Sequence, residues 1–311
     1  MRPVVAVVDI GSNSIKVLVA TRSDSGNIRT LATHAIDARI SAGINRTEPR
    51  LSADGMARGL VATRELLADV GAYAPDRILL VATSAVRDAV NGPEFGALVA
   101  RETGHKIRVL TGEEEAAGIG HGLTCEPALA ALQDFYVFDL GGGSLECLAF
   151  RGRRVEQSLS LQLGCVRLTE KFVPDASAAF PAVACNQIQQ HAKAALSAFR
   201  FALPAASVGV GTGGTVASIR SIRAAAVGCK AEETSPLVPL SELRDLLGRL
   251  APLTLAERRQ VSGLSAARAD VFPTALATLL AIAEQGGLGA FQHSFYNLRY
   301  GLAAELLDEL A

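Results

Sequence analysis

Residues Val137–Glu146 read V-F-D-L-G-G-G-S-L-E, and residues Val7–Ile15 near the N-terminus read V-V-D-I-G-S-N-S-I. In both stretches an apolar run ends in an aspartate, and a glycine-containing turn with a serine leads into a second apolar run. This order predicts a strand, a tight turn and a second strand, with a carboxylate at the end of the first strand. We expect the turn glycines to take positive φ, which lets backbone N–H groups approach a ligand.

Such a turn suits an anion, and the aspartate at its mouth suits a hard divalent cation. Converging backbone N–H groups form an anion-binding nest, and Mg²⁺ is bound through carboxylates together with phosphate oxygens. A single Asp-x-Gly hairpin is most often only a turn, but this chain carries the pattern twice. The repeat therefore predicts two similar halves that face each other across a phosphate-binding cleft.

The composition indicates a globular protein with room for two domains. The chain has 311 residues, of which 49% are hydrophobic and 20% charged, and its net charge is −1. That charge favours neither nucleic acid nor a membrane surface as a partner. The five cysteines are odd in number and form no C-x-x-C pair, so we expect reduced thiols. No leader-like segment or membrane-length apolar run is evident in the sequence, which predicts a cytoplasmic protein.

The order of predicted elements is repeated as well. Strands, a helix, a strand and a helix fill the first half, and a new series begins at Phe135, as in a ribonuclease-H-like domain and its duplicate. We therefore predict an α/β fold with domains at 1–120 and 121–297, and a terminal helix at 298–311 that can pack back on the first domain. The predicted strands are Val4–Asp9, Ile15–Thr21, Ile28–Ile40, Arg77–Ala82, Lys106–Leu110, Tyr136–Leu140, Leu145–Arg151, Val155–Gln162, Ser207–Val210 and Phe291–Phe295.

Two further stretches can hold phosphate. Gly211–Thr215 reads G-T-G-G-T between a predicted strand and a predicted helix, which places a glycine-rich turn at a helix N-terminus. Thr83, Ser84 and Arg87 follow another predicted strand, where hydroxyl groups and a guanidinium can bind phosphate oxygens. An ordinary helix N-cap explains Thr83 and Ser84 equally well. His121, in a G-H-G sequence, is predicted to be a loop residue, and Ser144 has no histidine partner that would make it a nucleophile.

Several of these motifs together resemble one family. The chain is similar to the exopolyphosphatase/guanosine pentaphosphatase (Ppx/GppA) family of the actin-like, sugar-kinase and Hsp70-like ATPase superfamily. It lacks a His-Asp dipeptide and so resembles the short two-domain form, and its C-terminal motif at 294–301 lacks the first glycine that the family usually shows. The motifs are D-I-G-S-N-S at 9–14, T-S-A-V-R-D-A at 83–89, T-G-E-E-E-A at 111–116, D-L-G-G-G-S-L-E at 139–146, L-G-C-V-R-L-T-E at 163–170, G-T-G-G-T at 211–215 and R-A-D-V at 268–271.

The resemblance implies two actin-like ATPase domains and hydrolysis of a terminal phosphate with Mg²⁺, or with Mn²⁺ in its place. It also implies that Glu115, the glutamate directly before Ala116, activates the attacking water, which leaves Glu113 and Glu114 as helix-start acids. Arg167 is the one arginine of the second half that we select as a phosphate ligand. The full set of candidates is Glu115 and Arg87 for catalysis; Asp9, Asp139 and Glu146 for the metal; and Gly11, Ser12, Asn13, Ser14, Thr83, Ser84, Gly141, Gly142, Gly143, Ser144, Arg167, Gly211, Thr212, Gly213, Gly214 and Thr215 for phosphate.

The sequence leaves the substrate open. The first expectation is an exopolyphosphatase that releases orthophosphate from inorganic polyphosphate, and the alternative is a guanosine pentaphosphate (pppGpp) 5′-phosphohydrolase. Guanosine tetraphosphate is a further possible ligand, and both a monomer and a homodimer are compatible with the sequence. Outside this class, a sugar-kinase-like phosphotransferase shares the phosphate cradles, and a non-catalytic nucleotide-sensing protein shares the clamp.

Overall fold

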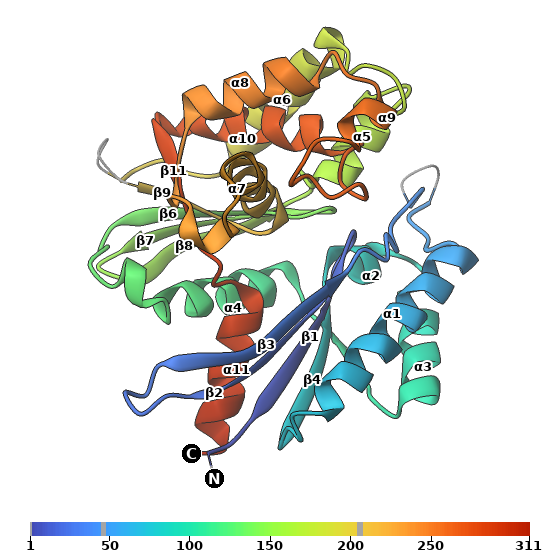
Figure 1. The fold of residues 1–311 in the computed structure, drawn as a ribbon, viewed down its shortest axis with the longest axis vertical. Helices are drawn as coiled ribbons and strands as arrows, with labels where there is room; N and C mark the ends of the chain where they lie inside the picture. Colours follow the sequence, from blue (N-terminus) through green and yellow to red (C-terminus); the bar gives the residue numbers. More distant parts are fainter. Residues whose placement is uncertain (1, 45–47, 204–207) are drawn as a thin grey trace. The chain divides into compact units, whose positions relative to one another are not determined.

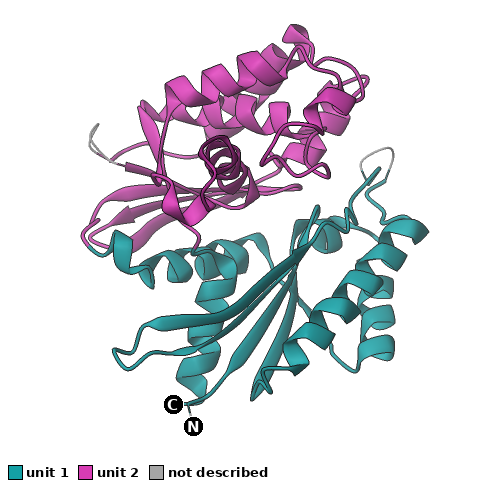
Figure 2. Cartoon of the chain, in the orientation of Figure 1, with its two compact units in different colours: residues 1–130, 296–311 teal, residues 131–295 magenta. Residues whose placement is uncertain are grey.

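The computed structural model describes residues 2–44, 48–203 and 208–311, and it confirms a mixed α/β fold with two domains. Unit 1 comprises residues up to Ala130 together with Tyr296–Ala311, and unit 2 comprises Ala131–Phe295 (Figure 2). Each unit contains one sheet. Both chain termini therefore belong to unit 1, and the C-terminal helix is part of that unit.

Unit 1 is built on a five-stranded sheet with the strand order β3-β2-β1-β4-β5. The first three strands form antiparallel hairpins, whereas β4 and β5 are parallel to β1. The elements are β1 (Val5–Ile10), β2 (Ile15–Arg22), β3 (Ile28–Ile36), α1 (Ala53–Gly71), β4 (Arg77–Ala82), α2 (Ser84–Asp88), α3 (Gly92–Thr103), β5 (Ile107–Val109), α4 (Gly112–Thr124), the 3₁₀ turn η1 (Pro127–Leu129) and α11 (Leu298–Glu309).

Helices cover both faces of this sheet (Figure 1). One core joins alternate residues of β1 and β2 to α1 and α3, with Val8, Leu66 and Phe95 among its fully buried members. On the other side α11 contacts β1 and β2 and packs against α4. Because successive side chains of a strand point to opposite faces, burial on both faces explains why β1 is an almost unbroken apolar run.

Unit 2 repeats the hairpin series in a six-stranded sheet with the order β10-β11-β9-β6-β7-β8. The strands β6, β7 and β8 correspond to β1, β2 and β3, and β9 is parallel to β6 as β4 is to β1. The elements are β6 (Phe135–Leu140), β7 (Leu145–Arg151), β8 (Arg154–Leu161), α5 (Cys165–Phe172), α6 (Ala182–Leu196), β9 (Val208–Thr212), α7 (Gly214–Val227), the 3₁₀ turn η2 (Ala231–Glu233), β10 (Leu237–Pro239), α8 (Leu240–Leu250), α9 (Leu255–Arg258), α10 (Phe272–Gly286) and β11 (Ala290–His293).

The core of unit 2 is organised around α10. This helix contacts α5, α6, α7 and α8, and every residue from Phe272 to Ala283 is buried. A helix that is apolar on all sides belongs inside a domain, which explains why its buried part, from Phe272 to Ala283, carries no charged side chain. Phe138 and Phe291 from the sheet meet edge-on in the same core, with ring centroids 6.0 Å apart. The packing of these helices thus fixes the position of the sheet and of the ends of β6 and β9.

Two local predictions were wrong, and one strand was missed. The strand predicted to run to Ile40 ends at Ile36, because Arg39 takes a φ of 47° and its N–H bonds the carbonyl of Asn13. The sequence predicts a helix from Ser84 to Val90 that the pair Asn91-Gly92 closes, but α2 ends at Asp88 and the pair opens α3, with a proline in its first turn. The short strand β10 was not predicted. Of the strand predicted at Ser207–Val210, Ser207 lies outside the described residues.

None of the described helices is both long and apolar enough to cross a membrane.

Candidate functional site

The turn 11–14 joins β1 to β2, as the sequence predicts. Ile10 and Ile15 are the last register partners, and the Gly11 N–H donates to the carbonyl of Ser14 over 3.2 Å. The expected positive φ is not found in either hairpin turn: Gly11, Gly141, Gly142 and Gly143 are absent from the positive-φ glycines of the described chain. Neither turn uses a left-handed backbone at these glycines. A side chain added there would therefore be limited by the space around it and not by the backbone conformation.

Unit 1 brings its predicted phosphate residues together. The strands β1 and β4 are parallel, and their last residues, Ile10 and Ala82, are register partners. Their C-terminal ends therefore lie side by side. The Ser12 hydroxyl therefore lies 3.1 Å from the Ser84 hydroxyl, at the start of α2. Thr83 occupies the N-cap position of α2 without a side-chain capping bond. Capping does not account for its hydroxyl, which leaves that group available to a ligand.

Glu115 and Arg87 form an ion pair in the same unit. Nη1 of Arg87 donates to Oε2 of Glu115 over 2.8 Å and to the Leu110 carbonyl over 3.1 Å. The Glu115 residue is only 7% exposed. Arg87 comes from α2 and Glu115 from the first turn of α4, so the Ser12–Ser84 contact and this ion pair meet on the short helix α2. The turn 11–14, the residues of α2 and Glu115 thus form one linked cluster.

The three consecutive glutamates of α4 differ in their surroundings. Glu114 forms a capping box with Thr111 and an ion pair with Arg108, 2.7 Å between Oε1 and Nη2. The hydrogen bond from Arg108 lowers the pKa of Glu114. Glu113 is exposed, and Glu115 is the only buried member of the run. The helix-start role expected for Glu113 and Glu114 agrees with these positions.

Asp9 lies at the end of β1 among cationic groups that were not predicted. Lys16 is its register partner on β2, and the side chains of opposed residues share one face of a sheet. Lys16 and Arg299 of α11 both lower the pKa of Asp9, but burial outweighs them and raises it. Arg299 also donates to the Val17 carbonyl over 3.3 Å. Lys16 and Arg299 therefore offset only part of the cost that burial imposes on the Asp9 charge.

The turn 141–144 of unit 2 is held from behind by the start of α5. The N–H groups of Cys165 and Val166 donate to the carbonyls of Gly141 and Gly142 over 3.0 and 2.9 Å. A side chain on Gly164 would lie 2.3 Å from the Gly142 carbonyl. Nε of Arg167 donates to the Gly143 carbonyl over 2.9 Å, which brings the predicted phosphate ligand to this turn.

Two carboxylates and a glycine turn meet at the ends of β6 and β9. Asp139 and Glu146 are register partners, and Ser160 of β8 donates to Glu146 over 2.8 Å. Gly213 precedes α7 with a φ of 87°, and a Cβ there would lie 2.2 Å from Oδ1 of Asp139. The Thr215 hydroxyl lies 3.5 Å from the Leu140 carbonyl. The structure thus joins the turn 211–215 to the turn 141–144.

Arg268 is a neighbour of this cluster that we did not select from the sequence. Its guanidinium lies against the backbone of Gly214, where a Cβ would be 2.1 Å from Nη2. A cation next to a helix N-terminus that opens with a glycine turn adds to the attraction for an anion. The R-A-D-V motif at 268–271 marks Arg268 in the sequence, but no spacing rule predicts that this residue contacts residue 214.

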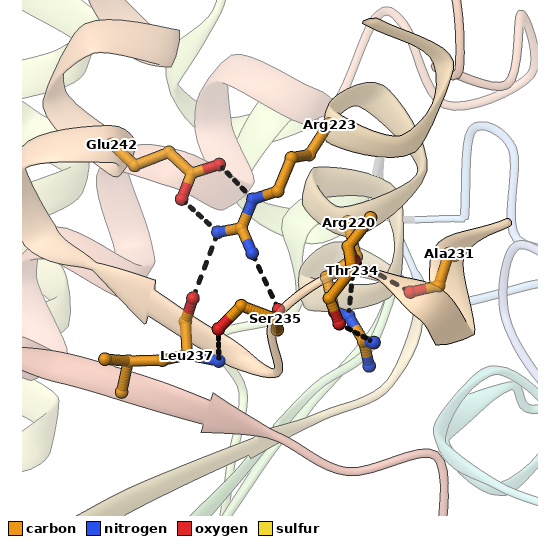
Figure 3. Close-up of polar contacts among 7 residues, drawn as sticks. All are labelled: Arg220, Arg223, Ala231, Thr234, Ser235, Leu237 and Glu242. Carbon is orange, nitrogen blue, oxygen red and sulfur yellow. Dashed lines mark hydrogen bonds and ion pairs between the residues drawn. The ribbon is translucent and has the colours of Figure 1, made fainter. Parts of the chain in front are cut away.

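Arg220 and Arg223, by contrast, are used structurally (Figure 3). Arg223 forms an ion pair with Glu242 through two nitrogens and donates to the carbonyls of Ser235 and Leu237. Arg220 donates to the hydroxyl and the carbonyl of Thr234 over 3.1 and 2.6 Å. Burial and the Arg220 charge together lower the pKa of the neighbouring His293 to about 3. Both arginines thus fasten the segment before β10 to α7.

The carboxylates of unit 2 suit Mg²⁺ better than a metal ion that takes all of its ligands from the protein. The described residues contain no group of three or more His, Cys, Asp or Glu side chains arranged to hold a metal ion. Mg²⁺ needs only one or two carboxylates when phosphate and water complete its shell. Asp139 and Glu146 are such a pair, and Asp9, between Lys16 and Arg299, has less need of a cation.

Comparison with known proteins shows similarity to one family of phosphatases. Residues 18–310 match the Ppx/GppA phosphatase family. Two proteins of Vibrio cholerae serotype O1, both named guanosine-5′-triphosphate,3′-diphosphate pyrophosphatase, are 32% identical over 313 residues, which covers 99% of this chain and 60% of theirs. The crystal structure of an exopolyphosphatase from Cytophaga hutchinsonii is 20% identical, covers 98% of both chains and gives a TM-score of 0.88. A Ppx/GppA structure from Aquifex aeolicus is 24% identical, covers both chains fully and gives 0.79.

The chain therefore belongs to the Ppx/GppA phosphatase family and has the actin-like ATPase fold of its members. It spans 60% of the length of the curated relatives it matches.

Proposed function

We propose that the protein is a phosphoanhydride hydrolase that removes the terminal phosphate of inorganic polyphosphate with the help of Mg²⁺ or Mn²⁺. The observation that supports this most is the pair Arg87–Glu115. A carboxylate that is almost fully buried, held by a guanidinium at 2.8 Å, is linked through α2 to the turn 11–14. A hydrolase of this kind needs a group that orients a water next to a phosphate cradle, and here the carboxylate of Glu115 is linked to the hydroxyls of such a cradle.

The proposed roles follow from these positions. Glu115 orients the attacking water and accepts its proton. Arg87 fixes the carboxylate, and with the hydroxyls of Thr83 and Ser84 it can bind phosphate oxygens. In unit 2 the turns 141–144 and 211–215, together with Arg167 and Arg268, bind further phosphate oxygens. Asp139 and Glu146 would hold the metal, which, when bound, offsets the negative charge that develops on the phosphoryl oxygens.

A second substrate has a specific observation in its favour. The curated Vibrio relatives act, by name, on guanosine-5′-triphosphate,3′-diphosphate, and they match 99% of this chain. pppGpp offers the same terminal phosphoanhydride as polyphosphate, with a guanosine at the other end. A pppGpp 5′-phosphohydrolase therefore remains the alternative, and guanosine tetraphosphate would be its product.

One assay separates these alternatives. Phosphate release is measured side by side from long polyphosphate, tripolyphosphate, pppGpp and ATP, with Mg²⁺ and with EDTA. The proposal expects Mg²⁺-dependent release that is fastest from long polyphosphate. A preference for pppGpp would replace the substrate and keep the reaction. A transfer of phosphate to an added sugar would indicate a phosphotransferase, and binding without any release would indicate a nucleotide sensor.

A further inference from the structure

The C-terminal end of α4 carries a group of reactive side chains that the proposed hydrolysis does not use. His121 lies in the last turn of α4, so the prediction of a loop at this residue is wrong. Its Nδ1 is 3.5 Å from Oε1 of Glu305 on α11. Cys125 caps the same helix, one turn after His121, and its N–H lies 3.3 Å from the His121 carbonyl. All three residues belong to unit 1.

The His121 imidazole interacts with both the Cys125 side chain and the Glu305 carboxylate. Residues four apart on a helix are neighbours on its surface, which brings the Cys125 side chain to the His121 ring. A hydrogen bond between these two side chains raises the pKa of His121, and Glu305 raises it further, against the effect of burial. A base in reach of a nucleophile, itself oriented by a third group, is the arrangement that activates thiols and hydroxyls in enzymes.

We propose that Cys125 is an activated thiol, with His121 as its base and Glu305 as the carboxylate that orients His121, and that it is a site of covalent modification by peroxides and soft electrophiles. With hydrogen peroxide, the imidazole accepts the thiol proton and a sulfur lone pair attacks one oxygen. The O–O bond breaks, and the departing hydroxide takes the proton from the imidazolium to become water. The sulfur is oxidised by two electrons to a sulfenic acid, and the peroxide is reduced by two.

The other cysteines provide internal references. Cys147 and Cys165 are buried, and burial raises the pKa of both thiols. Burial also raises the pKa of Cys185. Cys229 is partly exposed like Cys125, but its thiol contacts the Lys230 carbonyl, 3.4 Å away, instead of an imidazole. Cys229 is therefore the matched thiol of similar access without a base.

Tyr296 is a further titratable neighbour of Cys125. Burial raises the pKa of the Tyr296 hydroxyl most, and Tyr300, Glu126 and the Cys125 thiol raise it further. Tyr296 and Tyr300 stack with ring centroids 4.0 Å apart. The activation that we propose is proton transfer from the thiol to His121. Removing that imidazole should therefore remove the reactivity.

The experiment measures the alkylation rate of each cysteine in the folded protein. Limiting iodoacetamide is added across pH 5.5 to 9, and the modified peptides of Cys125 and Cys229 are quantified by mass spectrometry from the same sample. We expect Cys125 to react about tenfold or more faster than Cys229 near neutral pH, as base-assisted nucleophiles do. His121→Gln should reduce the Cys125 rate to the Cys229 level and remove the inflection that imidazole titration gives. Glu305→Gln should move that inflection to lower pH, while Glu126→Gln should leave it in place.

Peroxide supplies the second readout. A dimedone adduct should form at Cys125 in the wild type and be reduced in His121→Gln, with circular dichroism confirming that both proteins are folded. The proposal is overturned if Cys125 reacts no faster than Cys229, or if His121→Gln keeps both the rate and its pH profile.

Discussion

Asp139 on β6 and Glu146 on β7 are direct register partners, so two carboxylates share one face of the sheet at the mouth of the turn 141–144. The equivalent pair of unit 1 is Asp9 and Lys16, in which a cation replaces the second carboxylate. Like charges in opposed positions repel unless a cation lies between them. The same hairpin thus has an opposed cation in unit 1 and an opposed carboxylate in unit 2, and we propose the second pair as the metal ligands.

We expect Asp139→Asn and Glu146→Gln each to abolish Mg²⁺-dependent phosphate release and also the stabilisation by Mg²⁺. A metal that binds only the folded state raises the thermal midpoint by mass action. In EDTA the variants should be as stable as the wild type or more stable, by about 0.2–1 kcal/mol, because the repulsion between opposed like charges is relieved. The measurement is thermal unfolding with and without Mg²⁺.

The control for this pair is Glu156→Gln on β8, whose carboxylate pairs with Arg151 at the surface. It should keep the full Mg²⁺ response. An equal Mg²⁺-induced shift in all four proteins would show that the metal binds elsewhere.

Glu115→Gln should lower kcat by about 10²–10⁴-fold, because the amide keeps the shape of the side chain but cannot accept a proton. Substrate binding should be retained or become tighter, since one negative charge leaves a site for a polyanion. Glu113→Gln and Glu114→Gln are matched controls on the same helical turn. Glutamine can also serve in the capping box of Glu114, so Glu113→Gln loses only helix-dipole stabilisation of roughly 0.3–1 kcal/mol, and Glu114→Gln loses in addition the surface ion pair with Arg108.

The measurements are kcat and substrate Kd for the three single variants. If all three behave alike, or if Glu115→Gln weakens binding at unchanged kcat, Glu115 is a structural or substrate-contact residue.

The hairpins, the glycine turn before α7 and most strands could be predicted from sequence, because each depends on residues that are close together in the chain. Apolar runs interrupted by Asp-x-Gly are local patterns, and the register of a two-residue-period strand follows from them. The short helix α3 and the strand β10 could not be predicted in the same way. Gly92 looks like a helix stop, yet it is glycine because a Cβ there would lie 2.1 Å from the Val86 carbonyl.

The candidate site was predictable only in part for the same reason. Asp139, Glu146 and the turns are local features, and Lys16 is as close to Asp9 in the chain, whereas Arg299 joins Asp9 through helix packing from the other end of the chain. Arg268 reaches Gly214 from more than fifty positions away along the chain. Positive φ at the hairpin glycines was a general expectation for tight turns, whereas the close approach that the structure shows is at Gly164, where a Cβ would lie 2.3 Å from the Gly142 carbonyl.

Gly213→Ala should remove activity by displacing Asp139, beyond its effect on stability. Its φ of 87° and ψ of −175° lie in a region that is almost exclusive to glycine, and the added Cβ would overlap Oδ1 of Asp139. Such backbone strain costs about 1–3 kcal/mol. Gly228→Ala at the other end of α7 also has positive φ, 72°, but no atom lies within 4 Å of its Cβ. That control should lose stability and keep its specific activity per folded molecule.

Activity is therefore measured at a temperature where both variants are folded. If Gly213→Ala retains wild-type kcat there, Asp139 does not need its present position against the turn 211–215.

Asp9 should make the protein less stable as pH rises, in contrast to most carboxylates. Burial raises its pKa in the folded state above the ordinary value of 3.8, so the folded protein holds the proton more tightly than the unfolded chain does. The contribution of Asp9 to stability is therefore greatest below 3.8 and is lost as pH rises through the folded-state pKa. Asp9→Asn removes this titration, so the stability of the wild type relative to Asp9→Asn should fall across that window.

Glu114 contributes a pH dependence of stability of the opposite sign: its pKa is lowered from 4.5, and its contribution is present above 4.5 and lost as pH falls. Denaturant unfolding of the wild type, Asp9→Asn and Glu114→Gln at several pH values tests both signs together, and parallel pH curves for the wild type and Asp9→Asn would mean that Lys16 and Arg299 fully offset the burial of Asp9.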